Sequence, residues 1–277
     1  MQTVDLDRWE DFEAKLREYG FRNPDDSSYW LFRGQRESTW PLQTTLERAG
    51  RKGLFVAEYC RIIEQLRREI QTHTGTVWDF PEFHRFNQLL QTFTLKNGMV
   101  DIKPALLDYM HFLRDHGFPS PLLDWSRSPY IAAYFAFREH AGPSTDGPPR
   151  SVYAYRTPGI NSQWREDRPS ILQSPHNVGS TKRHFLQQCA YTMALNFEDP
   201  AGWRFMDHED VMRRERMGIG GWSWTPADSI GFKFNLPGTE RVRVLRLLDE
   251  HNLNAYSLFD TDDTFIETMA IRALDFA

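Results

Sequence analysis

The stretch LLDWSRSPYIAAYFA, residues 122–136, decides how we expect the chain to fold. Its first two residues are an apolar leucine pair that can end a strand, and Asp124 to Ser128 form a short polar corner. Pro129 stands where a first-turn proline belongs, and an apolar helical run follows it. Such a corner predicts either backbone N–H groups that bind a phosphate or another anion, or simply a cap of a buried helix by Asp124 or Ser126.

Length and composition narrow the class of protein. The chain has 277 residues, a net charge of −5 and 14% aromatic residues, which is typical of a folded protein without a global field that attracts nucleic acid or anionic membranes. It has no apolar run near the ~20 residues that span a bilayer and no signal pattern at its N-terminus. Two isolated cysteines, Cys60 and Cys189, form neither a disulfide framework nor a zinc site, so we expect a cytoplasmic protein without a bound metal.

Periodicity around this stretch predicts the remaining elements. Helical spacing covers residues 9–19, 54–72, 89–93, 105–113, 239–250 and 264–277. Strand patterns cover residues 29–32, 151–155, the second half of 183–195, and 230–234. We therefore expect one α+β domain over residues 1–277, with a small, split, mainly antiparallel sheet and an N-terminal helical insertion at about 46–114. We expect long functional loops or a lid over residues 157–182, and a loop insertion at about 200–224.

Arg33 is a charged residue at an unexpected place, because it directly follows the apolar strand that ends at Phe32. A buried guanidinium costs free energy unless it is paired or faces a cleft. Arg33 is therefore expected either to pair with an internal carboxylate or to contact an anionic ligand.

Three segments together resemble the FRG domain family, over roughly residues 25–270. They are Phe32-Arg33-Gly34-Gln35, the segment 117–136, and Arg183 with Gln187 and Gln188 before the later strand. Two positions depart from the family. Arg114 and Asp115 stand where Gln-His is frequent, and Ser120-Pro121 replaces the usual Thr-Arg.

The same pieces resemble, more distantly, the ADP-ribosyltransferase fold, in which they surround NAD. That resemblance implies that Arg33 holds the NAD phosphates or ribose, that Ser126 and Ser128 position the nicotinamide ribose, and that Gln187 or Gln188 takes the place of a catalytic glutamate. The catalytic candidates are Arg33, Ser126, Gln187 and Gln188. The candidates for binding NAD as substrate are Arg33, Gly34, Gln35, Asp124, Trp125, Ser128 and Arg183.

Cleavage of the nicotinamide–ribose bond develops positive charge on the ribose, which a carboxylate can stabilise and a glutamine cannot. Asp124 is the nearest candidate in the sequence, and the other candidates are Glu166, Asp167, Asp260, Asp262 and Asp263. Trp125 either stacks on nicotinamide or adenine or packs in the core.

Three hypotheses follow. The first is an NAD-consuming ADP-ribosyltransferase-like enzyme, a toxin or defence effector that modifies a protein or nucleic acid and is held by a regulatory or antitoxin partner. It predicts that Arg33, Ser126 and Gln187 converge on one cleft. The second is a non-catalytic module that binds a nucleotide or a partner, with no carboxylate near the ribose. The third is a nucleic-acid-binding protein, which needs a basic face made by Arg61, Arg67, Arg68, Arg213, Arg214 and Arg216.

Overall fold

The structure is a computed structural model of the 277-residue chain. It describes residues 1–21, 30–80, 104–139, 147–157, 169–173, 182–198, 202–216 and 231–276. The helix expected at 89–93 and the carboxylates Glu166 and Asp167 lie outside the described residues.

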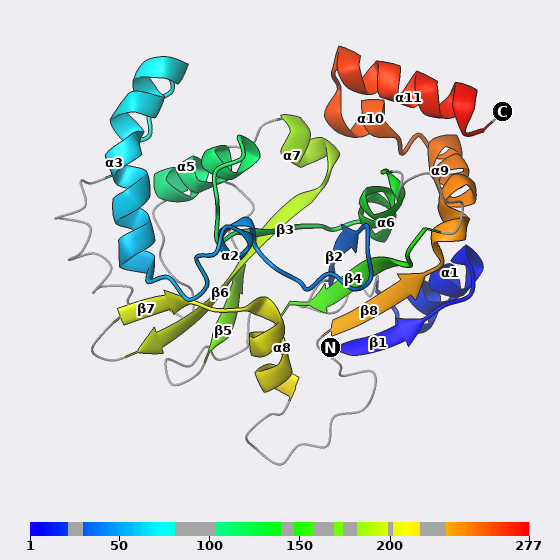
Figure 1. Ribbon diagram of the computed structural model, residues 1–277, viewed down its shortest axis with the longest axis horizontal. Helices are drawn as coiled ribbons and strands as arrows, with labels where there is room; N and C mark the ends of the chain where they lie inside the picture. Colours follow the sequence, from blue (N-terminus) through cyan, green and yellow to red (C-terminus); the bar gives the residue numbers. More distant parts are fainter. Residues whose placement is uncertain are drawn as a thin grey trace.

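The described strands form one sheet that consists of two halves (Figure 1). Its strands are β1 (Gln2–Asp5), β2 (Trp30–Gln35), β3 (Leu123–Ser126), β4 (Arg150–Arg156), β5 (Ser170–Gln173), β6 (Cys189–Glu198), β7 (Gly202–Phe205) and β8 (Gly231–Leu236). Their order is β1-β8-β4-β2-β3-β6-β5, with β7 also paired to β6. All pairs are antiparallel except β1–β8. The halves meet at β2 and β3, which share the single register pair Phe32–Ser126.

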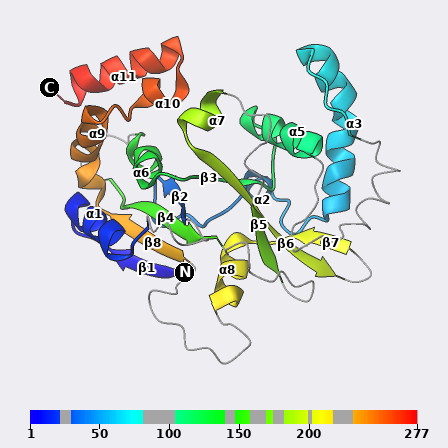
Figure 2. The same ribbon diagram turned by 180° about the vertical axis from the view of Figure 1, so that it is seen from behind.

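The helices gather over the two halves of this sheet (Figures 1 and 2). One group, between β2 and β3 in sequence, consists of α2 (Thr45–Arg48), α3 (Val56–Thr74) and α5 (Pro104–Asp115). The other helices are α1 (Trp9–Glu18), α6 (Pro129–Phe137), α7 (Lys182–Leu186), α8 (His208–Arg216), α9 (Arg241–Glu250), α10 (Ala255–Phe259) and α11 (Asp262–Leu274). One core joins α3 and α5 to β6 and β7 around Tyr59 and Tyr109, and a second joins α1, α6 and α9 to β2 and β8 around Phe12 and Phe234.

The β3–α6 unit forms as the proline and serine predict. Pro129 occupies the first turn of α6, and the Ser128 hydroxyl accepts a hydrogen bond from the Ile131 N–H at 3.4 Å. The helix is apolar all round because it is buried between β2 and α9. A Cβ on Gly34 would lie 2.0 Å from the Ala132 carbonyl oxygen, so this glycine lets α6 approach β2 closely.

The structure confirms the α+β class and a mostly antiparallel sheet. The polar corner is shorter than expected, because Asp124, Trp125 and Ser126 belong to strand β3, whose register with β6 extends as far as Ser126–Cys189. The expected last helix begins at Asp262, two residues earlier than its pattern indicates.

The loop insertion predicted at 200–224 is wrong for its described part. Residues 202–205 form β7, which pairs with β6 and buries Trp203 and Phe205. Residues 208–216 form α8, which buries Val211 and Met212. Likewise β5 and the start of α7 lie within the segment predicted as loops at 157–182. These edge strands are only four residues long, so their stability depends on pairing with β6 more than on local pattern. Among the described residues, no helix combines the length and apolar character needed to cross a membrane.

Candidate functional site

A cleft of about 350 Å³, open solvent included, lies at the join between the two halves of the sheet. Segments far apart in sequence line it: β2, β3, α6 and the start of β6. Its lining residues are Phe32, Arg33, Gly34, Asp124, Trp125, Ser126, Ala132, Phe135, Gln187 and Cys189.

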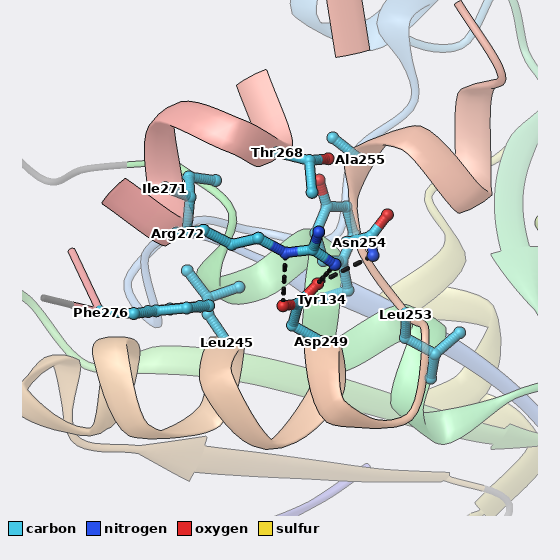
Figure 3. A pocket seen from close by; sticks show the side chains of 10 residues that line it. All are labelled: Tyr134, Leu245, Asp249, Leu253, Asn254, Ala255, Thr268, Ile271, Arg272 and Phe276. Carbon is cyan, nitrogen blue, oxygen red and sulfur yellow. Dashed lines mark hydrogen bonds and ion pairs between the residues drawn. The ribbon is translucent and has the colours of Figure 1, made fainter. Parts of the chain in front are cut away.

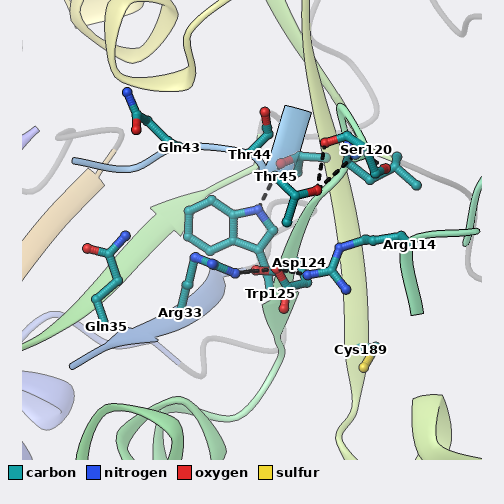
Figure 4. Close-up of polar contacts among 12 residues, drawn as sticks. Arg33, Gln35, Gln43, Thr44, Thr45, Arg114, Ser120, Asp124, Trp125 and Cys189 are labelled. Atoms are coloured by element: carbon teal, nitrogen blue, oxygen red, sulfur yellow. Dashed lines mark hydrogen bonds and ion pairs between the residues drawn. The ribbon is translucent and has the colours of Figure 1, made fainter. Parts of the chain in front are cut away.

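The Asp124 carboxylate and the Arg33 guanidinium line the cleft, and a second guanidinium, Arg114, contacts Asp124 from beside it. Arg33 is ion-paired with the Asp124 carboxylate, and its Nη1 also donates to the Asp124 backbone oxygen at 2.8 Å. Arg114 Nη2, at the end of α5, lies 2.5 Å from the same Asp124 Oδ1. The two arginines approach this carboxylate from opposite sides (Figure 4). The Asp124 side chain is 37% exposed, against 14% for Arg33 and 17% for Arg114, so a ligand can reach the cluster.

The electrostatics of this cluster keep Asp124 ionised. Burial alone would raise the pKa of its carboxyl, but Arg114 and Arg33 hold that pKa well below its usual range. Two guanidinium groups share the Asp124 carboxylate, and a second carboxylate, Asp115, lies 3.7 Å from Arg114 Nη1. A third guanidinium is near, because burial and then the neighbouring Arg33 lower the pKa of Arg48. Within the described part of the chain, the buried Nε atoms of Arg33 and Arg114 have no hydrogen-bond partner. A negatively charged ligand would offer these guanidinium groups further hydrogen-bond acceptors.

Ser126 and Gln187 reach the cleft with their polar groups already bonded to the protein. Ser126 Oγ donates to the Gln187 backbone oxygen at 2.9 Å and accepts from the Ser128 N–H at 3.1 Å. The Gln187 side-chain amide donates to the Leu258 carbonyl in α10 at 3.1 Å. The predicted convergence of Arg33, Ser126 and Gln187 on one cleft is thus present in the structure. Both Ser126 and Gln187 hold the wall of the cleft in place.

The remaining predicted catalytic and binding residues are not among those that line the cleft. Gln188 is exposed with φ at +49°, and its carbonyl accepts from the Arg127 N–H at 3.0 Å. Ser128 caps α6. Gln35 is buried and its amide donates to the Pro41 carbonyl at 3.2 Å. Arg183 is exposed and lies over the Phe259 ring, 4.7 Å from its centroid.

Trp125 belongs mainly to the core. It is 3% exposed, and its indole Nε1 donates to Thr192 Oγ1 at 2.8 Å on the opposite face of β3 from Asp124. Thr192 Oγ1 in turn lies 3.0 Å from Nε2 of the buried His208. The core-packing alternative therefore describes this side chain.

A second polar layer lies behind Arg114. Asp115 Oδ2 lies 3.3 Å from His184 Nε2, which is 2.5 Å from Tyr191 Oη. Burial, and then the neighbouring His184, lower the pKa of His111 to about 3, so His111 is neutral. Burial, and then Asp124, raise the pKa of Cys189 to about 12, so its thiol is a poor nucleophile at neutral pH.

The other predicted carboxylates that the structure describes do not line the cleft. Asp260 is ion-paired with Lys182, and Asp262 and Asp263 are exposed in the first turn of α11. Among the described residues, Asp124 is thus the carboxylate that lines the cleft. In the described part of the chain, no group of three or more His, Cys, Asp or Glu side chains is arranged to hold a metal ion.

A known protein family matches one part of the chain, and that part contributes most of the residues that line the cleft. Residues 28–144 match the FRG domain family. No curated protein and no solved structure matches the chain significantly. The FRG match contains β2, α5, β3 and α6, and with them Arg33, Arg114 and Asp124. The Gln187–Cys189 side of the cleft comes from outside the matched residues.

Sequence analysis missed the role of Arg114 within this FRG region, where it appeared only as a departure from the family. The signal lies in helical spacing, because His111, Arg114 and Asp115 at i, i+3 and i+4 share one face of α5. All three side chains are largely buried, which is unusual for a charged helical face. Cys189 and Phe135 were also missed, since isolated apolar residues carry no local signal of a cleft.

Proposed function

We propose that the cleft binds NAD as substrate and cleaves its nicotinamide–ribose bond, with transfer of the ADP-ribosyl group to a macromolecular acceptor. The observation that carries this proposal is an ionised carboxylate, Asp124, in the same cleft as Arg33, Ser126 and Gln187. The alternative of a non-catalytic module expected a cleft without a carboxylate, so Asp124 favours the enzyme.

The chemistry assigns Asp124 an electrostatic role. When the ribose C1′–N bond breaks, its electron pair leaves with nicotinamide, and positive charge develops on the ribose ring. A carboxylate held beside the ring stabilises that charge. A lone pair on the acceptor then forms the new bond to C1′, and the proton of the acceptor is released. The lowered pKa of Asp124 keeps it negative at neutral pH without further activation.

The arginines suit the other half of the substrate. The diphosphate of NAD carries two negative charges, and planar guanidinium groups bind phosphate oxygens well. Arg33 and Arg114 each have one terminal nitrogen on Asp124, while their buried Nε groups have no hydrogen-bond partner among the described residues. A diphosphate at the cleft would accept hydrogen bonds from these guanidinium groups. Gln187 has no charge, and its amide is occupied by Leu258, so it supports the wall.

A second candidate is a nucleotide-binding module that cleaves nothing. It is favoured by the pairing of Asp124 with both arginines and by the occupied side chains of Ser126 and Gln187. In this candidate Asp124 only positions Arg33 and Arg114. The nucleic-acid-binding hypothesis has weaker support, because Arg213 of its basic face lies 3.2 Å from Asp210 and Arg67 lies 3.8 Å from Glu64.

The test is release of nicotinamide from NAD by the purified protein, with and without cell lysate as a source of acceptors. The Arg33→Ala variant is the test variant and Arg272→Ala the control, because Arg272 pairs with Asp249 outside the cleft. Release by the wild type and the control but not by Arg33→Ala, with label transferred to an acceptor, supports the proposal. NAD binding without release moves the assignment to the binding module. Release without labelled acceptors indicates transfer to water.

A further inference from the structure

A row of ionisable side chains continues from the cleft into the protein behind it. Its outer part is Asp124, with Arg33 and Arg114 on either side (Figure 4). Arg114 Nη1 lies 3.7 Å from Asp115 Oδ1, and Asp115 Oδ2 lies 3.3 Å from His184 Nε2. Basic and acidic groups therefore alternate along five side chains, which we call the charge row.

Asp115 belongs to this row without lining the cleft. Its side chain is 14% exposed, with one oxygen facing Arg114 and the other facing His184 from α7. His184 is fixed in turn, because its Nε2 lies 2.5 Å from Tyr191 Oη in β6. Burial would raise the pKa of Asp115, but the hydrogen bond from His184, and then the charges of His184 and Arg114, hold that pKa below its usual value. Arg114 therefore has a second negative charge behind it.

Arg114 divides its guanidinium between the two carboxylates. Its Nη2 lies 2.5 Å from Asp124 Oδ1, and its Nη1 is the nitrogen that faces Asp115. The negative charge of Asp115 offsets part of the positive potential that Arg114 exerts at Asp124. Asp124 consequently keeps more of its negative charge for a ligand than it would beside an undivided Arg114.

We propose that Asp115 is a positioning residue that acts through Arg114 and keeps the Asp124 carboxylate available to the ribose during cleavage. This inference rests on the proposed function and adds to it a residue outside the cleft. The two halves of the substrate respond to Asp115 in opposite ways. Asp124 stabilises the positive charge on the ribose, whereas Arg114 binds the diphosphate. The presence of Asp115 therefore favours cleavage over tight binding of the diphosphate.

The first experiment compares cleavage and binding in Asp115→Asn, which keeps the size of the side chain and removes its charge. The kcat for nicotinamide release from NAD is expected to fall about fivefold, while the Kd for ADP-ribose falls by a similar factor. Both changes have one cause, because the whole charge of Arg114 then acts on Asp124 and on the diphosphate. A general loosening of the site would instead slow release and weaken binding together, so the opposite signs identify the positioning role.

Two further variants serve as controls for this experiment. Asp115→Glu keeps the charge and should restore both values toward those of the wild type. Asp275→Asn is the matched control, because the Asp275 side chain is 15% exposed and pairs with Arg241 at 2.8 Å outside the cleft. It should lower stability and leave kcat and Kd unchanged. Wild-type values of kcat and Kd in Asp115→Asn, or a loss of both activity and affinity, would overturn the proposal.

The second experiment needs no substrate, so it separates this inference from the proposed function. Urea unfolding is measured for Asp115→Asn, Asp124→Asn and the double variant. If both carboxylates share Arg114, the double variant should lose more stability than the two single losses combined, whereas Asp275→Asn with Asp124→Asn should be additive. Additive losses for Asp115 and Asp124 would overturn the sharing, even in a protein that releases nicotinamide. Losses that exceed additivity in a protein that releases none would support the sharing and contradict only the proposed reaction.

Discussion

The cleft at Asp124 and the pocket beside Asp249 differ in the balance of their charges. The pocket at Asp249 has a volume of about 250 Å³, open solvent included, and lies between α6, α9, α10 and α11 (Figure 3). There the carboxylate faces one guanidinium, Arg272, together with the neutral amide of Asn254 at 2.8 Å. In the cleft one carboxylate faces both Arg33 and Arg114.

This difference separates a structural ion pair from a binding site. Asp249 and Arg272 neutralise each other and fasten α11 to α9, so that pair needs no ligand. At the cleft, Asp124 is shared by two guanidinium groups whose buried Nε atoms have no partner in the described residues, and a nucleotide phosphate would offer such donors an acceptor. A lowered pKa alone does not distinguish the two sites, since the pKa of Asp249 is also below its usual value through its bonds to Arg272 and Asn254, against the effect of burial.

The largest expected difference between the two sites is in stability. Asp124→Ala leaves the largely buried Arg33 without its counter-charge and Arg114 with Asp115 alone, 3.7 Å away, and we expect it to lower the free energy of unfolding by about 3 kcal/mol. Asp249→Ala leaves one half-exposed guanidinium, Arg272, and should cost about 1 kcal/mol. Urea unfolding of both variants measures this. Equal losses would contradict the difference in charge balance.

The pH dependence of stability sharpens the same comparison. The folded-state pKa of Asp124 lies below its unfolded value, so its contribution to stability is present above that value and is lost as pH falls. The gap in free energy of unfolding between the wild type and Asp124→Asn should therefore be constant near neutrality and shrink below about pH 4. Urea unfolding at a series of pH values tests this, and a gap that widens on acidification would show that the carboxylate is not held ionised.

Ligand affinity is expected to respond to the cleft arginines alone. Arg114→Ala should weaken binding of ADP-ribose by about tenfold, through loss of a charged hydrogen bond, whereas Arg272→Ala should leave it unchanged. ADP-ribose lacks nicotinamide and so reports binding without cleavage. Titration calorimetry at low and high salt gives both affinities, and the affinity of the wild type should fall as salt rises. An affinity that salt and Arg114→Ala leave unchanged would exclude the phosphates as the recognised group.

The smallest expected effect concerns Tyr134 in the pocket at Asp249. Its side chain is 1% exposed, and burial raises the pKa of its hydroxyl, which has no hydrogen-bond partner among the described residues. Tyr134→Phe removes that unsatisfied group. The variant should lose less than about 0.5 kcal/mol of the free energy of unfolding, or be more stable than the wild type. Calorimetric melting measures it. A loss above about 1 kcal/mol would reveal a bound water or ligand in the pocket.

Sequence predicted the parts of the fold that local chemistry sets. Pro129 and Ser128 mark the start of α6, and the apolar run after them gives its buried faces. Arg33 was correctly singled out as a charge that needs a partner, and its alternatives included the internal carboxylate that Asp124 supplies.

The parts that failed depend on distant segments. β1 pairs with β8 230 residues away, and β5 pairs with β6 19 to 25 residues away. β7 pairs with β6 only 4 to 10 residues away, but like β1 and β5 it has just four residues, which is too short for a periodic pattern. Helical spacing places Arg114 on one face of α5 with His111 and Asp115, but its contact with Asp124 forms only in the tertiary structure. The sharing of Asp124 between Arg33 and Arg114 is therefore a property of the tertiary structure.

The most direct test of the central claim is nicotinamide release from NAD by the wild type and by Asp124→Asn, which keeps the shape of the side chain and removes its charge. Asp249→Asn serves as the control for a lost carboxylate elsewhere. If Asp124 stabilises the charge on the ribose, the wild type and Asp249→Asn release nicotinamide, and Asp124→Asn is slower by about 100-fold or more while it still binds ADP-ribose. Equal release by the wild type and a folded Asp124→Asn, or no release by any of them, would contradict the account.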